Sequence, residues 1–139
     1  MKIKTLIYES KILPNKDTLS PFVIEITKYF NENGINVKPF PKVHIKVDEE
    51  NAKKALGKTA YYDPNQKSVT LYTSGRHIKD VLRSYAHELV HHNQNLKGTL
   101  HNIQTSDVNE DDKLEALEKE AYLNGNILFR KWENSLTDG

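Results

Sequence analysis

The feature that most constrains the fold is a pair of histidines four residues apart, His87 and His91, inside a segment with helical periodicity. Gly98 follows this segment, and the pattern predicts a helix from about His77 to Lys97. On such a helix both imidazoles lie on one face, close enough to reach the same ion. An apolar stripe at helical spacing runs beside them: Ile78, Val81, Leu82, Tyr85 and Leu89.

Glu88 follows the first histidine directly, so the segment reads His87-Glu88-Leu89-Val90-His91. The Glu88 carboxylate points to the same side of a helix as the two imidazoles and can reach a water molecule on their metal ion. In sites of this kind zinc lowers the pKa of its bound water to about 7 and the glutamate acts as general base. The sequence contains no cysteine, so a metal must be held by histidine and carboxylate.

A second helix is predicted from about Lys113 to Asn134 and supplies the candidate third ligand. At about 100° per residue, its inward face carries Leu114, Ala121, Gly125, Leu128 and Trp132. Glu118 falls inside this apolar face, where a carboxylate is costly unless a cation meets it. Zinc held by the two histidines would be that cation, so Glu118 is the predicted third ligand. Glu120 points towards solvent on the same wheel and is the alternative in a different register.

Gly125 lies on this inward face, where a glycine costs about 1 kcal/mol relative to alanine in a helix interior. We interpret it as the point at which the last two helices approach each other closely. That approach would bring Glu118 to the histidine pair.

The rest of the chain predicts short strands and one further long helix. A hairpin is expected between Lys58 and Thr73, with Asp63-Pro-Asn-Gln66 as its turn. The order is β-α-β-(α)-β-β-α-α, an α+β fold in which a small mixed sheet with an edge hairpin packs against the two C-terminal helices. At 139 residues, one domain over residues 1–139 is expected. The predicted upstream elements are a strand at Lys2–Tyr8, a helix that Ser20 caps with Pro21 at its first position and that Asn33-Gly34 ends, a strand at Pro41–Val47 and a short helix at Asp48–Leu56.

The motif and the downstream glutamate resemble the gluzincin branch of the HExxH zinc peptidases. In that branch a glutamate on a later helix, in a pattern like Glu-x-x-Ala-Asp, completes the zinc site; the matching residues here are Glu118-Lys-Glu-Ala-Tyr122. The closest likeness is to minimal zincins of the ImmA/IrrE and SprT-like kind, and the segment from Leu82 to Gln94 is also similar to small peptidases encoded by tailed phages. The resemblance covers about residues 58–132 and implies a minimal zincin-like fold with one zinc ion per chain.

The resemblance also implies roles for further residues. Extended peptide would bind along the hairpin at residues 59–73 by backbone pairing. Tyr122 stands where the family has an aspartate that orients a zinc-bound histidine; it would instead donate its hydroxyl to a tetrahedral oxyanion, or simply pack. A SprT-like arrangement would use His101 as third ligand. His101 and a tyrosine of the hairpin are the other candidates for stabilising the oxyanion.

Together these residues predict a zinc metallopeptidase in which His87, His91 and Glu118 bind the metal and Glu88 and Tyr122 act in catalysis. The alternative is a non-catalytic protein on the same scaffold, such as a phage virion component or a metal-stabilised interaction module. The retained Glu88 argues against it, because a structural site has no use for a general base.

Charge and hydropathy give no support for a nucleic-acid-binding, secreted or membrane-spanning protein. Lys plus Arg (20) nearly balance Asp plus Glu (19), so net charge gives no argument for nucleic acid as a partner. No signal-peptide segment or membrane span is visible in the sequence. The expected location is therefore the cytoplasm, or, for a phage-encoded protein, the host cytoplasm or the virion.

Overall fold

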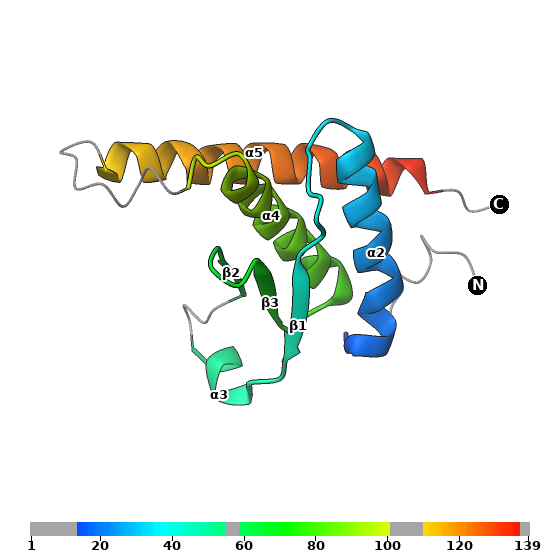
Figure 1. Cartoon of the computed structure of the whole chain (residues 1–139). Helices are drawn as coiled ribbons and strands as arrows, with labels where there is room; N and C mark the ends of the chain where they lie inside the picture. The colour runs from blue at the N-terminus through cyan, green and yellow to red at the C-terminus, as the bar shows by residue number, and fades with distance from the viewer. Residues whose placement is uncertain (1–13, 55–58, 101–109, 137–139) are drawn as a thin grey trace.

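The computed structural model describes residues 14–54, 59–100 and 110–136. Within them, the strands form a mixed sheet in the order β1-β3-β2, with β1 parallel and β2 antiparallel to β3. The structure confirms the predicted α+β class and the predicted hairpin, which is β2 and β3 (Figure 1). The elements are α2 (Lys16–Glu32), β1 (Lys42–Lys46), α3 (Glu49–Ala52), β2 (Ala60–Asp63), β3 (Ser68–Tyr72), α4 (Ile78–Leu96) and α5 (Glu110–Ser135).

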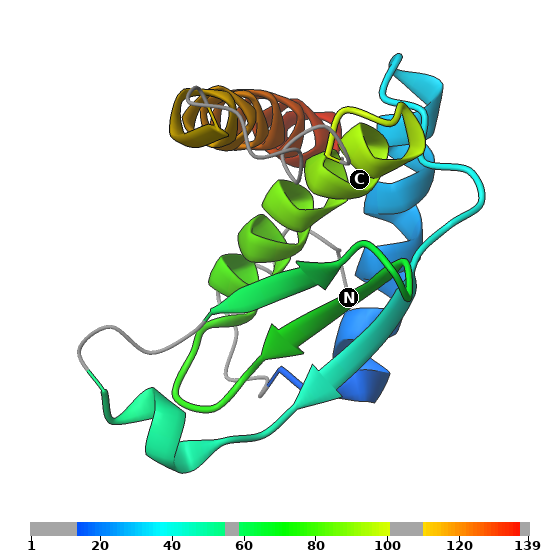
Figure 2. The same ribbon diagram turned by 60° about the vertical axis from the view of Figure 1, so that its left-hand side comes forward.

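The helix α4 is the centre of the fold, since it contacts α2, α5, β2 and β3. In Figure 2 the sheet lies in front of α4 and α2, and α5 is seen almost end-on at the top, with its N-terminal end towards the viewer. Alternation along β3 sends Val69 and Leu71 into the core, where both are fully buried. The same core takes fully or almost fully buried side chains from all three long helices: Ile26, Phe30, Leu82, Leu89, Phe129 and Trp132.

The ends of α4 agree with the prediction within the precision that helix ends allow. His77 is the N-cap and its Nδ1 accepts a hydrogen bond from the Lys79 backbone N–H at 3.1 Å. At the other end Gly98 has a φ of 82°, in the left-handed region that suits a glycine after a helix. Every residue of the predicted apolar stripe of α4 is buried, so the histidine motif lies on a well-anchored helix.

The predicted start of α2 is wrong, because the helix begins at Lys16, before Ser20. Asn15 is the N-cap: its Oδ1 accepts from the Thr18 N–H at 3.0 Å, and the Thr18 hydroxyl oxygen accepts from the Asn15 N–H at 2.9 Å. The Ser20 hydroxyl instead donates to the Lys16 carbonyl at 2.6 Å, inside the helix. Pro21 is therefore an interior residue of α2, and the helix ends at Asn33 as predicted.

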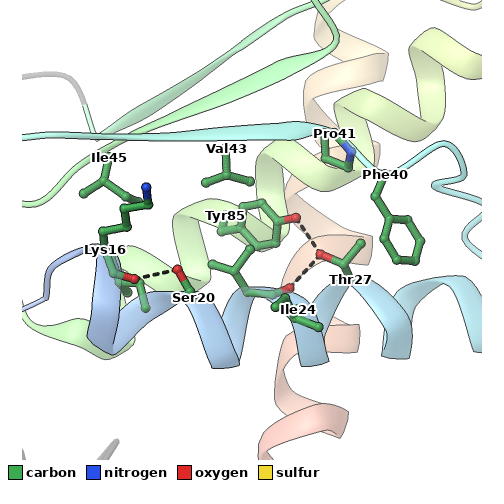
Figure 3. Close-up of a pocket in the computed structure, with 11 residues that line it drawn as sticks. Lys16, Ser20, Ile24, Thr27, Phe40, Pro41, Val43, Ile45 and Tyr85 are labelled. Atoms are coloured by element: carbon green, nitrogen blue, oxygen red, sulfur yellow. Dashed lines mark hydrogen bonds between the residues drawn. The ribbon is translucent and has the colours of Figure 1, made fainter.

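A hydrogen bond between Thr27 and Tyr85 joins α2 to α4 (Figure 3). The Tyr85 hydroxyl donates to the Thr27 hydroxyl at 2.6 Å, which in turn donates to the Val23 carbonyl at 2.6 Å. Both side chains line a cavity of about 280 Å³ between α2 and β1. Burial raises the pKa of Tyr85 above its usual range, so the hydroxyl keeps its proton and the tie between the helices holds.

One predicted helix is shorter than expected, and one predicted strand falls outside the described residues. The helix predicted at Asp48–Leu56 is α3, which ends at Ala52 and has Asp48 as its N-cap. The strand predicted at Lys2–Tyr8 and the residue His101 lie outside the described residues. Among the described residues, no helix combines the length and the hydropathy that a membrane span requires.

Candidate metal centre

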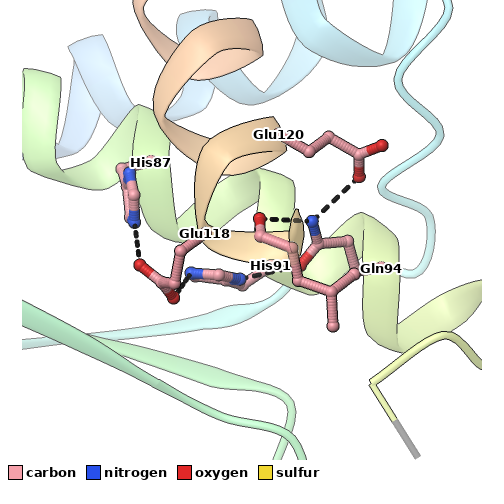
Figure 4. A network of polar contacts seen from close by, with 6 residues as sticks. His87, His91, Gln94, Glu118 and Glu120 are labelled. Carbon is pink, nitrogen blue, oxygen red and sulfur yellow. Dashed lines mark hydrogen bonds and ion pairs between the residues drawn. The ribbon is translucent and has the colours of Figure 1, made fainter. Parts of the chain in front are cut away.

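The structure brings together the three predicted ligands, two from α4 and one from α5 (Figure 4). His87, His91 and Glu118 each offer one donor atom, and these atoms all lie within 4.8 Å of one another. Glu118 Oε2 lies 3.3 Å from His87 Nε2, and Glu118 Oε1 lies 2.8 Å from His91 Nε2. Within the described residues, this is the group of histidine and carboxylate side chains that could hold a metal ion.

The chemistry of this group fits zinc. Two imidazole nitrogens and one carboxylate oxygen are a known donor set for a catalytic zinc site, which leaves one coordination position open. Ligand atoms bound about 2.0–2.1 Å from one tetrahedral ion lie about 3.3 Å apart. The contact between His87 and Glu118 has this spacing, and the contact between His91 and the other carboxylate oxygen, at 2.8 Å, is shorter. At 2.8 Å, His91 Nε2 either donates a hydrogen bond to Glu118 Oε1 or shares a cation with it.

Gly125 explains why α5 can lie so close to α4. A Cβ atom built on Gly125 would lie 3.2 Å from His87 Cα and 3.3 Å from the Ala86 carbonyl oxygen. Those atoms belong to the backbone of α4 and cannot turn away as a side chain could. The prediction that this glycine marks a close helix approach is confirmed, and the contact is with the backbone of the first histidine itself.

Glu118 is the residue that sequence reasoning selected, but its environment differs from the expected one. Its side chain is 52% exposed, so the energetic cost of a buried carboxylate does not apply. The N-terminal part of α5 extends along an open cleft, and Leu114, expected to face inward, is also 45% exposed. Helical periodicity found the correct face of α5, because that face turns towards α4 whether or not it is covered.

Glu88 lies with the three candidate ligands in one cleft of about 530 Å³. The Glu88 residue is 8% exposed and is therefore almost shielded from solvent. The opposite wall is the hairpin, through Thr59, Ala60, Tyr61, Tyr62 and Pro64. A carboxylate, a group of side chains that could hold a metal ion and an edge strand therefore line one cavity.

Burial raises the pKa of Glu88 to about 7; the nearby His91 opposes this shift and the Glu118 carboxylate adds to it. Burial also lowers the pKa of His87, with a further contribution from His91, whereas Glu118 acts in the opposite direction. A carboxyl with a pKa near 7 can both take up and release a proton at neutral pH. A neutral imidazole is the form that binds a metal.

The raised pKa of Glu88 predicts a pH-dependent stability for the metal-free protein. The pKa of Glu88 is about 7 in the folded protein and 4.5 in the unfolded chain. The contribution of protonated Glu88 to the free energy of unfolding is therefore complete below pH 4.5 and is lost as pH rises through 7. Metal-free Glu88→Gln is therefore expected to exceed wild type in unfolding free energy at pH 8 by on the order of 1–3 kcal/mol, and to match it near pH 4. Denaturant unfolding in chelator measures this, with the exposed Glu115→Gln as control; a difference that does not change with pH would contradict it.

Tyr122 does not lie in this cleft. Its side chain is 68% exposed and lines a separate pocket with Arg83 and Asn126. The structure therefore gives no contact that supports a role for Tyr122 at an oxyanion. Glu120, the alternative ligand, accepts a hydrogen bond from Gln94 instead of joining the histidines.

The hydroxyl of Tyr62 is committed to the protein interior. Its partner His92 is fully buried and its Nε2 donates to the Pro39 carbonyl at 2.7 Å. Burial lowers the pKa of His92, so the ring is neutral and its Nδ1 accepts the Tyr62 proton at 2.6 Å. The Tyr62 oxygen in turn accepts from Asn95. His92 is thus an interior histidine, and Tyr62 has no proton left for an oxyanion.

Sequence reasoning missed Gln94, which lies in direct contact with a candidate ligand. Its Oε1 is 2.8 Å from His91 Nδ1, and the residue is fully buried. The available signal was its position three residues after His91, which places both side chains on one side of α4. A buried glutamine beside a histidine motif indicates a hydrogen bond to one of the rings.

The comparisons with known proteins give no relative for this chain. No protein family model, no curated protein and no solved structure matches it. The likeness to the HExxH zinc peptidases therefore rests on the motif of α4 and on its cluster with Glu118.

Proposed function

We propose that this chain is a zinc-dependent hydrolase that cleaves peptide bonds. The observation that carries the proposal is the presence of Glu88 in the same cleft as His87, His91 and Glu118. A site that only stabilised the fold would need ligands but no buried carboxylate beside them. When bound, zinc supplies a Lewis acid that polarises a carbonyl and acidifies a water molecule.

In this proposal Glu88 moves the proton. Its carboxylate accepts a proton from the water that attacks the scissile carbonyl carbon, and it later delivers that proton to the leaving amine as the carbon–nitrogen bond breaks. The pKa of about 7 suits both directions of transfer at neutral pH. His87, His91 and Glu118 hold the metal and leave the hairpin side of the cleft open to substrate.

The edge strand β2 supports a peptide as the substrate. Among the described residues β2 lies at one end of the strand order β1-β3-β2 and pairs with β3, so it forms an edge of the sheet. An extended peptide could add to that edge as a further strand, which places it along the wall of the cleft. Backbone pairing of this kind recognises the peptide chain more than its sequence.

The test is zinc-dependent cleavage of a mixed peptide library, followed by mass spectrometry. Zinc-loaded protein is expected to produce new termini, a chelator is expected to stop the reaction, and about one equivalent of zinc is expected to restore it. Glu118→Ala protein, prepared in the same way, controls for a contaminating peptidase. Cleavage that survives chelation, or that the Glu118→Ala preparation shows equally, would contradict the proposal.

A further inference from the structure

A chain of buried polar contacts runs from α5 to the second histidine of the motif (Figure 4). Gln94 Nε2 donates to the Leu117 carbonyl at 2.9 Å and to Glu120 Oε1 at 2.8 Å. The same side chain presents Oε1 to His91 Nδ1 at 2.8 Å. Gln94 is fully buried, so these three contacts are its polar environment.

The two contacts to α5 fix the orientation of the Gln94 amide. Leu117 offers a carbonyl and Glu120 a carboxylate, and both groups only accept hydrogen bonds. The opposite amide orientation would turn Oε1 towards two acceptors at once. The nitrogen therefore faces α5, and the oxygen faces His91.

A fixed Oε1 determines which nitrogen of His91 carries hydrogen. Because Oε1 is an acceptor only, Nδ1 of His91 is the donor. The lone pair of the neutral ring then lies on Nε2, the atom 2.8 Å from Glu118 Oε1. His92, the next residue, has the opposite arrangement: its Nε2 donates to Pro39 and its Nδ1 accepts.

We propose that Gln94 is a positioning residue that commits His91 to binding metal through Nε2 and aligns it with Glu118. The second part follows from Leu117, which precedes Glu118 on α5 and is the backbone anchor of the Gln94 amide. One side chain thus sets the orientation of one ligand and the place of another. This inference rests on the proposed zinc site, but it does not require that the site be catalytic.

The test is zinc affinity, measured by competition with a chromophoric chelator, for three variants. Gln94→Leu keeps the size of the side chain and removes its polar atoms, and is expected to weaken zinc binding by about 10–100-fold. The double variant Gln94→Glu, Glu120→Gln restores an acceptor at Nδ1 and gives the other carboxylate oxygen a donor on α5, and is expected to recover most of that loss. Asn93→Leu removes a neighbouring buried amide that donates to the Asn36 carbonyl, and is expected to leave the affinity unchanged.

The coordinating nitrogen gives a second readout. Long-range proton–nitrogen NMR spectra of the zinc-loaded protein are expected to show His91 with hydrogen on Nδ1 and the metal on Nε2. Equal zinc affinity in wild type and Gln94→Leu would overturn the inference, as would coordination through Nδ1. If the double variant Gln94→Glu, Glu120→Gln binds zinc as weakly as Gln94→Leu, the role of Gln94 at Nδ1 is wrong.

The inference and the proposed function fail separately. The expected affinities with no peptide cleavage would remove the hydrolase and leave the role of Gln94 intact. Peptide cleavage with no effect of Gln94→Leu on zinc binding would do the opposite. A wild-type chain that takes up no zinc would overturn both.

Discussion

Glu88→Gln protein is expected to bind zinc like wild type and to hydrolyse peptides about 10²–10⁴-fold more slowly, the range that a general base contributes. Glutamine has nearly the shape of glutamate but cannot take a proton from the attacking water. Glu88 is also absent from the group of three side chains that could hold a metal, so its replacement removes no ligand. Initial rates on a cleaved library peptide, with zinc content from the same preparation, measure both quantities.

Glu115→Gln is the matched control for this experiment. Glu115 is an exposed glutamate of α5 with an ion pair to Lys119 at 3.6 Å, outside the cleft. Its substitution is expected to change neither zinc content nor rate. Full activity in Glu88→Gln would remove Glu88 from the reaction, and loss of zinc in that variant would make it a ligand instead of a base.

The part of the site that the sequence predicts correctly is the part that local geometry decides. His87 and His91 share a face because a helix repeats every 3.6 residues, and the apolar stripe beside them predicts that helix. Glu118 and Gly125 share a face of α5 for the same reason. Gly125 then contacts the backbone of His87, and this contact between the two helices is the tertiary contact that the sequence predicts most directly.

Glu118 lies at the two histidines as expected, but its side chain is more exposed than expected. An apolar helical face is not always a buried one: α5 extends past the sheet and leaves the Glu118 carboxylate half exposed. What places Glu118 at the histidines is the close helix approach, together with the contact of Gln94 to the Leu117 carbonyl. Periodicity identifies a face, but the depth at which that face lies depends on neighbouring elements.

The N-cap of α2 and the burial of His92 depend on which polar groups win the available hydrogen-bond partners, and sequence patterns do not decide this. Ser20-Pro21 is a good helix start by residue preference, yet the reciprocal bonds of Asn15 and Thr18 form the cap. His92 directly follows the motif on α4, yet it is buried and bonded to Tyr62 and to the Pro39 carbonyl. Such assignments require the partner of each polar atom, and the partner is often far away in sequence.

The second large effect is expected from Glu118. Removing one of three ligands leaves two histidines, so Glu118→Ala is expected to lose more zinc affinity than the 10–100-fold typical of a supporting residue, about 100-fold or more. Its exposure makes the substitution tolerable for folding, because a half-exposed side chain contributes little packing. Loss of zinc from this variant therefore reports on the ligand and not on the fold, which circular dichroism can verify.

The most direct test of the metal centre is zinc content by elemental analysis of protein purified without chelator. Wild type, Glu118→Ala, Glu115→Ala and His101→Ala would be compared after equal exposure to zinc. About one zinc per chain is predicted for wild type, Glu115→Ala and His101→Ala, and almost none for Glu118→Ala. A wild-type chain that takes up no zinc would contradict the account, and zinc that persists in Glu118→Ala but is lost in His101→Ala would show that the third ligand is wrong.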